Sequence, residues 1–334
     1  MNQDTLWLQV PAKQTLPLNL AGASHVADKL ENIAIKLASL QDNTTYYLDK
    51  INVILFAADH GITSDVGNSL AQPITKALLK KFSHSGDIHH VMENKLSTKL
   101  EVINLGTKTD LTSSDSIIHS VIARSTANFC CSPAMNNQQL ARAINIGRQS
   151  VQRIHISGTR LFVAGEINQT NNISALAMTY ALLNIAPEKL TVYDAAYNEK
   201  QNKEKNKLIR IALEQHKDKL SSPLEILQHL GSFEIAALTG AYLCCAHIGI
   251  PVLIDSFSNA VAALITTRLC PGAEQCFLYS RTSSNPAHNL ILKSLKAEPL
   301  LQLNKNIDGM AGITNALSLL HLACARHNKN ITFT

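Results

Sequence analysis

Two residues that could do chemistry follow the first long apolar run of the chain. Asp59 and His60 come directly after Ile51–Ala58, and Gly61 follows them. Polar groups at the carboxyl end of a buried strand, followed by glycine, suit a ligand site in an open α/β sheet. A structural explanation stands beside this one, in which Asp59 begins a turn and His60 only satisfies internal hydrogen bonds. The residues alone leave both explanations open.

A second polar segment could bind an anion. Gly165 and Glu166 end another apolar run, and the polar segment 168–172 leads from them into a helical pattern. Unpaired N–H groups at a helix N-terminus bind phosphate or carboxylate groups, although ordinary helix capping by asparagine explains the same residues equally well. Asp255–Asn259 is a loop of the same kind after a later apolar run.

Other kinds of chemistry have less support in the sequence. The glycine patterns of classical dinucleotide enzymes and of P-loop NTPases are absent from it. His84, His89 and His90 lie close together without further ligands, so we expect no metal site and no cofactor. The seven cysteines include no C-x-x-C pair, and most are expected to be small buried hydrophobic residues in a reducing compartment.

The elements that must position these groups alternate between strand and helix. Six short apolar runs are typical of strands covered on both faces; they are Ile51–Ala58, Leu100–Leu105, Arg160–Ala164, Leu190–Tyr193, Ile250–Asp255 and Cys276–Tyr279. Helical patterns occur at Ile74–Phe82, Gln138–Arg153, Ile173–Asn184, Glu204–His216, Phe233–His247, Ala260–Leu269 and Ala287–Lys296. We therefore predict an α/β fold with a doubly wound, mainly parallel sheet of about six strands.

The two ends of the chain carry helical patterns with no strand beside them. These are Val26–Leu40 and Gly312–Arg326. We predict that residues 1–45 and 297–334 form a small helical domain from both termini, beside a large Rossmann-like α/β domain at 46–296.

Composition narrows the class of protein. The 334 residues are 46% hydrophobic and 16% charged, which is typical of a globular protein. The net charge of +5 is spread out, and the mixed charges of Lys200–Lys207 are typical of a solvated helix face, so no nucleic acid partner is expected. Neither a signal-peptide pattern nor an apolar run of membrane-spanning length is visible. We therefore expect a cytoplasmic protein with no membrane partner.

Six segments, in order along the chain, carry a resemblance to a known family. They are FAADHGITSDVGNSLAQPIT (56–75), STANFCCSPAM (125–135), LFVAGEINQTNN (161–172), GSFEIAALTGAYL (231–243), PVLIDSFSNAVAAL (251–264) and YSRTSSNPAHNLILKSLKAEPLL (279–301). Together they resemble the nicotinate-nucleotide:dimethylbenzimidazole phosphoribosyltransferase family, which makes α-ribazole phosphate for the lower ligand of cobalamin.

The resemblance implies both an assembly and a reaction. It implies a homodimer whose small-molecule substrates are nicotinate mononucleotide and a benzimidazole-type base. A nitrogen of that base attacks the anomeric carbon, nicotinate leaves, and α-ribazole 5′-phosphate forms. The attacking base must lose a proton, so a carboxylate is useful. The 5′-phosphate requires backbone amides and a cation.

The resemblance implies two candidate catalytic carboxylates, Asp308 and Glu166. The family's base is a glutamate in an L-G-E-G-T-G segment, which corresponds to Ile307–Gly312, with Gly309 at the glutamate position. Asp308 stands one residue earlier and is one methylene shorter, and a misplacement of about 1 Å can cost ~100-fold in rate. Glu166 is retained from the family pattern and could act as a substitute base or ligand anchor.

The substrate-binding residues that the resemblance implies span most of the chain. They are Asp59, His60, Asn68, Gln72, Gly165, Asn171, Lys205, Asp255, Ser283 and His288. Arg281 stands where the family has histidine, and Asn168 and Thr170 stand where its phosphate loop has glycines. These departures keep a second interpretation open, a homologue that binds a nucleotide or a partner without turnover.

Overall fold

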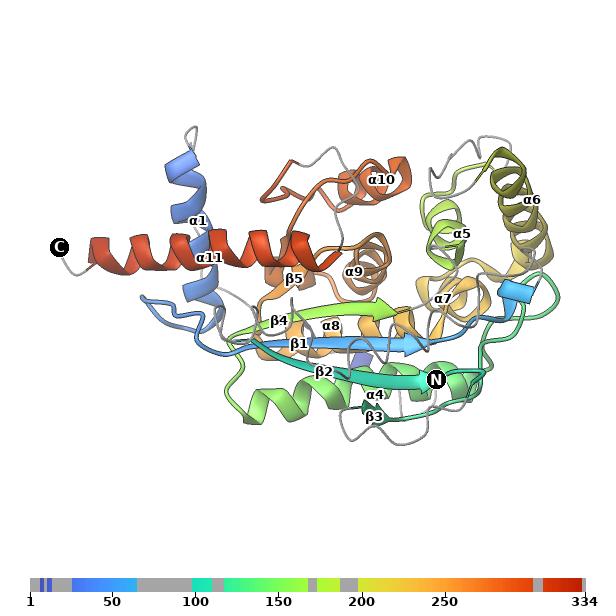
Figure 1. The fold of residues 1–334 in the computed structure, drawn as a ribbon, viewed down its shortest axis with the longest axis horizontal. Coiled ribbons are helices and arrows are strands. Elements are labelled where there is room, and N and C mark those ends of the chain that lie inside the picture. Colours follow the sequence, from blue (N-terminus) through green and yellow to red (C-terminus); the bar gives the residue numbers. More distant parts are fainter. Residues whose placement is uncertain are drawn as a thin grey trace.

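A six-stranded parallel sheet forms the centre of the protein. The computed structural model describes residues 7–8, 11–13, 26–64, 98–109, 117–167, 173–186, 198–302 and 309–331. Its strands are β1 (Ile51–Ala58), β2 (Thr98–Gly106), β3 (Ile117–His119), β4 (Leu161–Ile167), β5 (Val252–Ile254) and β6 (Phe277–Tyr279). They pair in parallel in the order β3-β2-β1-β4-β5-β6 (Figure 1). The predicted α/β class with a mainly parallel sheet is confirmed.

The strands differ from the prediction in two places. The predicted strand Leu190–Tyr193 lies outside the described residues. The remaining five predicted strands correspond to β1, β2, β4, β5 and β6. The prediction missed β3 because only Ile117 of its three residues is buried, so an edge strand this short gives no apolar run.

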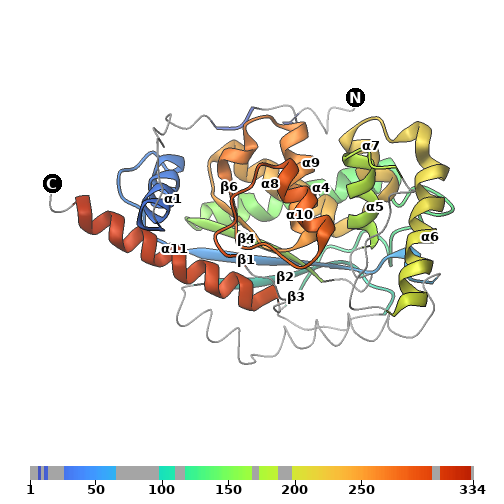
Figure 2. The ribbon, with the colours of Figure 1, turned by 90° about the horizontal axis from the view of Figure 1, so that it is seen from above.

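Helices cover both faces of the sheet. They are α1 (Val26–Leu40), α4 (Asn137–Ile156), α5 (Ile173–Leu182), α6 (Glu199–His216), α7 (Pro223–Leu230), α8 (Phe233–Ile248), α9 (Phe257–Leu269), α10 (Pro286–Ser294) and α11 (Gly309–Ile331). Figure 2 shows α4, α8 and α9 on one side of the sheet and α11 on the other. The predicted helix Ile74–Phe82 lies outside the described residues. The prediction missed α7, although Ser222 and Glu225 form a capping box around Pro223.

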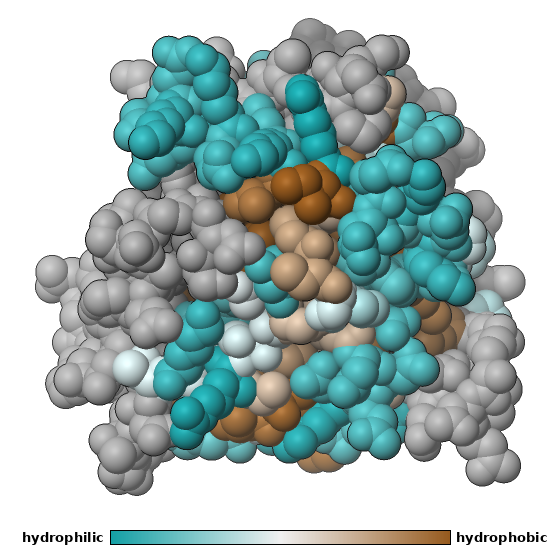
Figure 3. Space-filling view, turned by 90° about the vertical axis from the view of Figure 1, so that its right-hand side faces the viewer, coloured by the Kyte–Doolittle hydropathy of each residue, from teal (hydrophilic) through white to brown (hydrophobic). Residues whose placement is uncertain are grey.

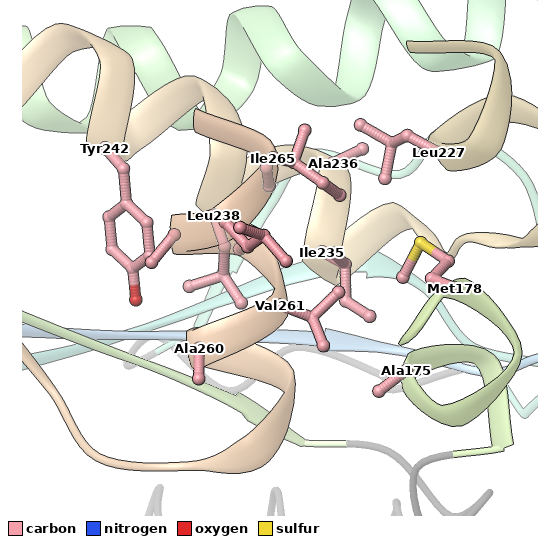
Figure 4. Close-up of a cluster of buried hydrophobic side chains, with 14 of the residues drawn as sticks. Ala175, Met178, Leu227, Ile235, Ala236, Leu238, Tyr242, Ala260, Val261 and Ile265 are labelled. Carbon is pink, nitrogen blue, oxygen red and sulfur yellow. The ribbon is translucent and has the colours of Figure 1, made fainter. Parts of the chain in front are cut away.

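Each face of the sheet has its own apolar core. Ile54 and Phe56 of β1 belong to the cluster under α4, α8 and α9, whereas Val53 and Leu55 belong to the cluster under α1 and α11. Successive side chains of a strand point to opposite faces, so one apolar run serves both cores. Figure 4 shows part of the first cluster, in which side chains of α8 and α9 meet those of α5 and α7.

The helices α1 and α11 bring the two ends of the chain together. They pack against each other, and the Glu31 carboxylate pairs with the His327 ring, whose other nitrogen lies 3.0 Å from the Thr44 carbonyl. Leu37 and Leu317 belong to the same apolar cluster as β1. The division of the chain into domains at 1–45 with 297–334 and at 46–296 stays a prediction.

The helix α8 is buried along nearly its whole length and touches α4 through glycine. A Cβ atom at Gly240 would lie 2.0 Å from the carbonyl oxygen of Ile144, and one at Gly147 would lie 1.8 Å from that of Ala237. The two helix backbones are therefore in direct contact. Within the described ranges, no helix combines the length and the apolar character needed to cross a membrane.

We expect Gly240→Ala to lower the free energy of unfolding by about 2–3 kcal/mol, because the added methyl group forces α4 and α8 apart. The helix propensity of alanine exceeds that of glycine by about 1 kcal/mol. The expected loss of packing energy must therefore be larger than this gain. Urea unfolding followed by circular dichroism measures the change. Gln149→Ala, on the exposed face of α4, is the matched control. If Gly240→Ala has the same free energy of unfolding as the wild type, the close contact between α4 and α8 does not contribute to stability.

Candidate active site at the carboxyl edge of the sheet

Four ionisable residues lie at or just beyond the carboxyl ends of neighbouring strands. Asp59 follows β1, Glu166 is the second-last residue of β4, Asp255 follows β5, and Arg281 follows β6. Parallel strands end at one edge, so the topology brings these residues to the same side of the molecule. Figure 3 shows the side toward which β1 and β4 point, where apolar side chains gather between hydrophilic ones.

Glu166 is held by the first turn of α9. The Ser256 hydroxyl lies 3.0 Å from both carboxyl oxygens of Glu166 and accepts a hydrogen bond from the Asn259 amide at 3.2 Å as the N-cap of that helix. One hydroxyl thus joins the end of β4 to the start of α9. Gly165 leaves room for the Leu55 side chain of the neighbouring strand β1, since a Cβ atom at Gly165 would lie 2.7 Å from Leu55 Cδ2.

The surroundings of Glu166 favour its protonated form. Burial of the carboxyl group raises its pKa to about 7, although hydrogen bonds from Ser256 and Ser258 act in the opposite direction. The nearby Glu234 carboxylate raises the pKa of Glu166 further. A carboxyl group that titrates near neutral pH beside a strand end suits general acid–base work.

The raised pKa of Glu166 predicts an effect on stability. Its folded pKa of about 7 lies above its ordinary value of 4.5, so its stabilising contribution is present below pH 4.5 and is lost as the pH rises through 7. We expect Glu166→Gln to be more stable than the wild type by about 2–3 kcal/mol at pH 8.5 and by little at pH 4.5. Urea unfolding at both pH values measures this. Equal stabilities at pH 8.5 would contradict the raised pKa of Glu166.

His60 and Glu234 form a buried pair behind this site. The His60 Nε2 atom lies 2.8 Å from Glu234 Oε1, and the side chains are 2% and 0% exposed. Within the part of the chain that the structure describes, the other oxygen of Glu234 is buried and has no hydrogen-bond partner. The sequence analysis did not single out Glu234, although it is the one acidic residue of an otherwise apolar helix.

Asp59 joins the ends of β1 and β2. Its carboxylate accepts a hydrogen bond from the Lys108 amide at 2.8 Å, and its own amide donates to the Gly106 carbonyl at 2.9 Å. Asp59 is 4% exposed. Asp59 and His60 therefore both have partners inside the protein, and the substrate contacts expected of them stay a prediction.

Asp255 and Arg281 form a second buried pair. The Arg281 Nε atom lies 3.2 Å from Asp255 Oδ1, and the Ser280 hydroxyl donates to the same oxygen. The first turn of α11 rests on this pair, because a Cβ atom at Gly312 would lie 2.6 Å from both Arg281 Nε and Asp255 Oδ1. The pairing of Asp255 was not predicted, and it directs the carboxylate toward Arg281. Its predicted contact with substrate stays a prediction.

Ser283 and His288 lie together at the start of α10. The Ser283 hydroxyl is 3.0 Å from His288 Nδ1. Burial, together with the charge of Arg281, lowers the pKa of His288 to about 4. The ring is therefore neutral near physiological pH, and its hydrogen bond with the Ser283 hydroxyl adds no charge to the site.

Lys205 differs from the lysines around it. It is 2% exposed, whereas the Lys203 and Lys207 side chains on the same helix are 76% and 67% exposed. The predicted solvated helix face therefore holds for those two lysines and not for Lys205. Lys205 is therefore turned into the protein, and its predicted contact with the substrate phosphate stays a prediction.

Four predicted site residues cannot be placed. Asn68, Gln72, Asn171 and Asp308 all lie outside the described residues. Within the described ranges, no three histidine, cysteine, aspartate or glutamate side chains gather in a way that could hold a metal ion.

Comparison with known proteins places the chain among phosphoribosyltransferases. A sequence profile described as Phosphoribosyltransferase matches residues 21–334. The nicotinate-nucleotide–dimethylbenzimidazole phosphoribosyltransferase of Xanthomonas axonopodis pv. citri is 38% identical over 305 residues, covering 91% of this chain and 87% of the relative. The same enzyme of Pseudomonas syringae pv. syringae is 37% identical with the same coverage.

Solved structures are similar over nearly the whole chain. A crystal structure of the nicotinate-nucleotide–dimethylbenzimidazole phosphoribosyltransferase of Thermus thermophilus superimposes with a TM-score of 0.80 at 26% identity, covering 98% of this chain and 94% of that chain. A structure of CobT from the same organism gives 0.82 at 26% identity, covering 98% and 95%.

Proposed function

The chain belongs to the nicotinate-nucleotide:dimethylbenzimidazole phosphoribosyltransferase family, and we propose that it moves the 5-phosphoribosyl group of nicotinate mononucleotide to a benzimidazole-type base. The products are nicotinate and α-ribazole 5′-phosphate. The α-ribazole 5′-phosphate is used to assemble the lower ligand of cobalamin. The observation that carries this proposal is the Glu166 carboxyl group, which titrates near neutral pH at the carboxyl edge of the sheet.

The proposed chemistry requires one proton acceptor. A benzimidazole nitrogen forms a bond to the anomeric carbon of the ribose, and the bond from that carbon to the pyridinium nitrogen breaks. The electron pair of the broken bond neutralises the pyridinium, so nicotinate leaves without an acid. The N–H proton of the attacking base passes to ionised Glu166, whose pKa near 7 matches this role.

Binding of the mononucleotide phosphate is assigned to the region of Lys205. The ammonium group of Lys205 would neutralise the 5′-phosphate, and the backbone amides near Asn171 would complete the site. We propose that Asp59, Ser283 and His288 line the same edge and that Asn68 and Gln72 contact the acceptor base.

Asp308 is the competing candidate for the base. It was expected from its place beside the family's glutamate position. Glu166 is preferred because its carboxyl group has a defined hydrogen-bond partner and a raised pKa. The single substitutions Glu166→Gln and Asp308→Asn show which of the two carboxylates is the general base.

We also propose that the chain forms a homodimer and acts in the cytoplasm. The homodimer is implied by the family resemblance, and the cytoplasmic location is the expectation drawn from the sequence. Sedimentation velocity of the purified protein tests the assembly, and a monomer at micromolar concentration would contradict it.

A nicotinate-release assay tests the function. Purified protein is incubated with nicotinate mononucleotide and 5,6-dimethylbenzimidazole, and both products are quantified by chromatography and mass spectrometry. We expect release of nicotinate that depends on the acceptor, and a panel of benzimidazoles, purines and phenols defines the preferred base. Binding of the mononucleotide in calorimetry without turnover for any acceptor would instead support the binding homologue that the altered Gly309 segment suggested.

A further inference from the structure

We propose that Ser256 is a positioning residue for Glu166: its hydroxyl links the positive end of helix α9 to the carboxyl group, holds that group in one orientation and stabilises its ionised form. This inference rests on the proposed role of Glu166 in the transfer. It adds to that role a hydroxyl that acts through Glu166 and not on the substrate.

The hydrogen bonds of Ser256 fix the direction of its hydroxyl proton. As the N-cap of α9, the Ser256 oxygen accepts a hydrogen bond from the Asn259 amide at 3.2 Å. The same oxygen lies 3.0 Å from Glu166 Oε1 and 3.0 Å from Glu166 Oε2. A backbone amide can only donate and an ionised carboxylate can only accept, so the serine proton points at Glu166 whenever Glu166 is ionised.

The three groups form a polarised chain of hydrogen bonds. The Asn259 amide donates to the Ser256 hydroxyl, and the hydroxyl donates to the carboxylate, so each bond strengthens the next. The Asn259 amide is one of the N–H groups left without an intrahelical partner at the start of α9, where the helix carries a partial positive charge. Ser256 thus extends the favourable end of α9 to an anion on β4.

The same contacts restrict the orientation of Glu166. Because Ser256 Oγ is equally far from both carboxyl oxygens, it lies in the plane that bisects the carboxyl group. The Asn259 side chain ties the same helical turn to β4, since its amide donates to the carbonyl of Ala164, two residues before Glu166. The first turn of α9 and the end of β4 therefore form one unit that aims the carboxylate.

Burial and the Ser256 hydroxyl act on Glu166 in opposite directions. Burial raises the pKa of Glu166, and the hydrogen bond from Ser256 lowers it. A hydrogen bond to an ionised acceptor is about twice as strong as one between neutral groups. Without the hydroxyl, Glu166 should therefore keep its proton to a higher pH.

Other titratable groups also face this part of the sheet from neighbouring elements; they are Glu234 and Tyr242 of α8, His60 after β1 and Asp255 after β5. Ser258, in the first turn of α9, donates a further hydrogen bond to Glu166. A substitution of Ser256 leaves all of these side chains in the protein. A change in the titration of Glu166 can therefore be assigned to the lost hydroxyl.

Two substitutions of Ser256 test the inference in the pH profile of kcat. Glycine and threonine cap helices about equally well, so Ser256→Gly and Ser256→Thr differ chiefly in the presence of the hydroxyl. We expect Ser256→Gly to raise the midpoint of the acid limb by about one pH unit. Ser256→Thr, which retains the donor, should keep the midpoint near that of the wild type.

The plateau of the same profile reports the orientation of Glu166. A higher pKa makes the ionised carboxylate a stronger base, so this change alone would raise the plateau. Loss of orientation acts the other way, and we expect kcat of Ser256→Gly at the plateau to fall by about tenfold. The KM for nicotinate mononucleotide should stay unchanged, and Ser256→Thr should recover most of kcat.

Ser222→Ala is the matched control for the loss of a helix cap. Ser222 is the N-cap of α7 and bonds to Glu225 instead of Glu166. Its removal should weaken the start of α7 and leave the midpoint of the acid limb where it is. A shift as large as that of Ser256→Gly would show that a general loosening of the fold is responsible, and would overturn the inference.

An infrared titration separates this inference from the proposed function. The carboxyl band of Glu166, obtained as the difference between a protein and its Glu166→Gln counterpart, reports protonation of Glu166 in the resting protein whether or not catalysis occurs. We expect a higher midpoint in Ser256→Gly than in the wild type and in Ser256→Thr. Equal midpoints in all three proteins would overturn the role of Ser256. A wild type that shows the titration but releases no nicotinate would instead overturn the proposed function.

Discussion

Glu166→Gln is expected to lower kcat for the phosphoribosyl transfer by at least about 100-fold, because a positioned general base typically contributes 10²–10⁴-fold. Glutamine preserves the size of the side chain and can still contact Ser256, but it cannot accept the N–H proton of the attacking benzimidazole. The KM for nicotinate mononucleotide should change little, since Glu166 is assigned to proton transfer and Lys205 to the phosphate. Steady-state assays at saturating acceptor measure both constants.

The pH profile of the wild type provides the second part of this prediction. Glu166 must be ionised to accept a proton, so kcat should rise with pH through about 7 and level off above it. The residual activity of Glu166→Gln should lack this limb.

Two results would assign the general base to a residue other than Glu166. The first is a Glu166→Gln variant that retains nearly full activity. The second is an Asp308→Asn variant that loses activity together with the acid limb. Glu214→Gln controls for the removal of a glutamate charge from the surface.

The sheet could be predicted from the sequence because it depends on local pattern. A strand such as β1 is apolar at every position and buried on both faces, so the run of residues and the element coincide. The edge strand β3 has no such run and was missed. The helix ends were less well placed, since α6 begins at Glu199, directly after its Asn198 cap and five residues before the predicted start.

The site could be predicted only in part because its partners are distant in sequence. The positions of Glu166 and Asp255 at the carboxyl edge were expected from their place after apolar runs. The pairing of His60 with Glu234 spans 174 positions and depends on how α8 lies against β1 and β4. No local pattern specifies such a contact, and the one signal that could have shown it, a single acidic residue in the apolar helix α8, was not used.

The other large effect is expected at Arg281. Asp255 and Arg281 are 2% and 8% exposed, so removing the guanidinium leaves a carboxylate buried with only the Ser280 hydroxyl as a described partner. Loss of one member of a buried ion pair typically costs about 3–5 kcal/mol. We expect Arg281→Ala to lower the free energy of unfolding by that amount in urea unfolding at pH 7.

The asymmetry between single and double variants tests the cause of that loss. Removing both charges, as in Asp255→Asn with Arg281→Ala, should destabilise the protein less than Arg281→Ala alone, because no uncompensated charge remains. If the double variant loses the sum of the two single losses, packing rather than charge is responsible. The ion pair also supports Gly312 in the first turn of α11, which follows directly after Asp308. A drop in kcat of the stable double variant would therefore indicate that the start of α11 must be fixed for catalysis, whereas full activity would leave the pair a structural role alone.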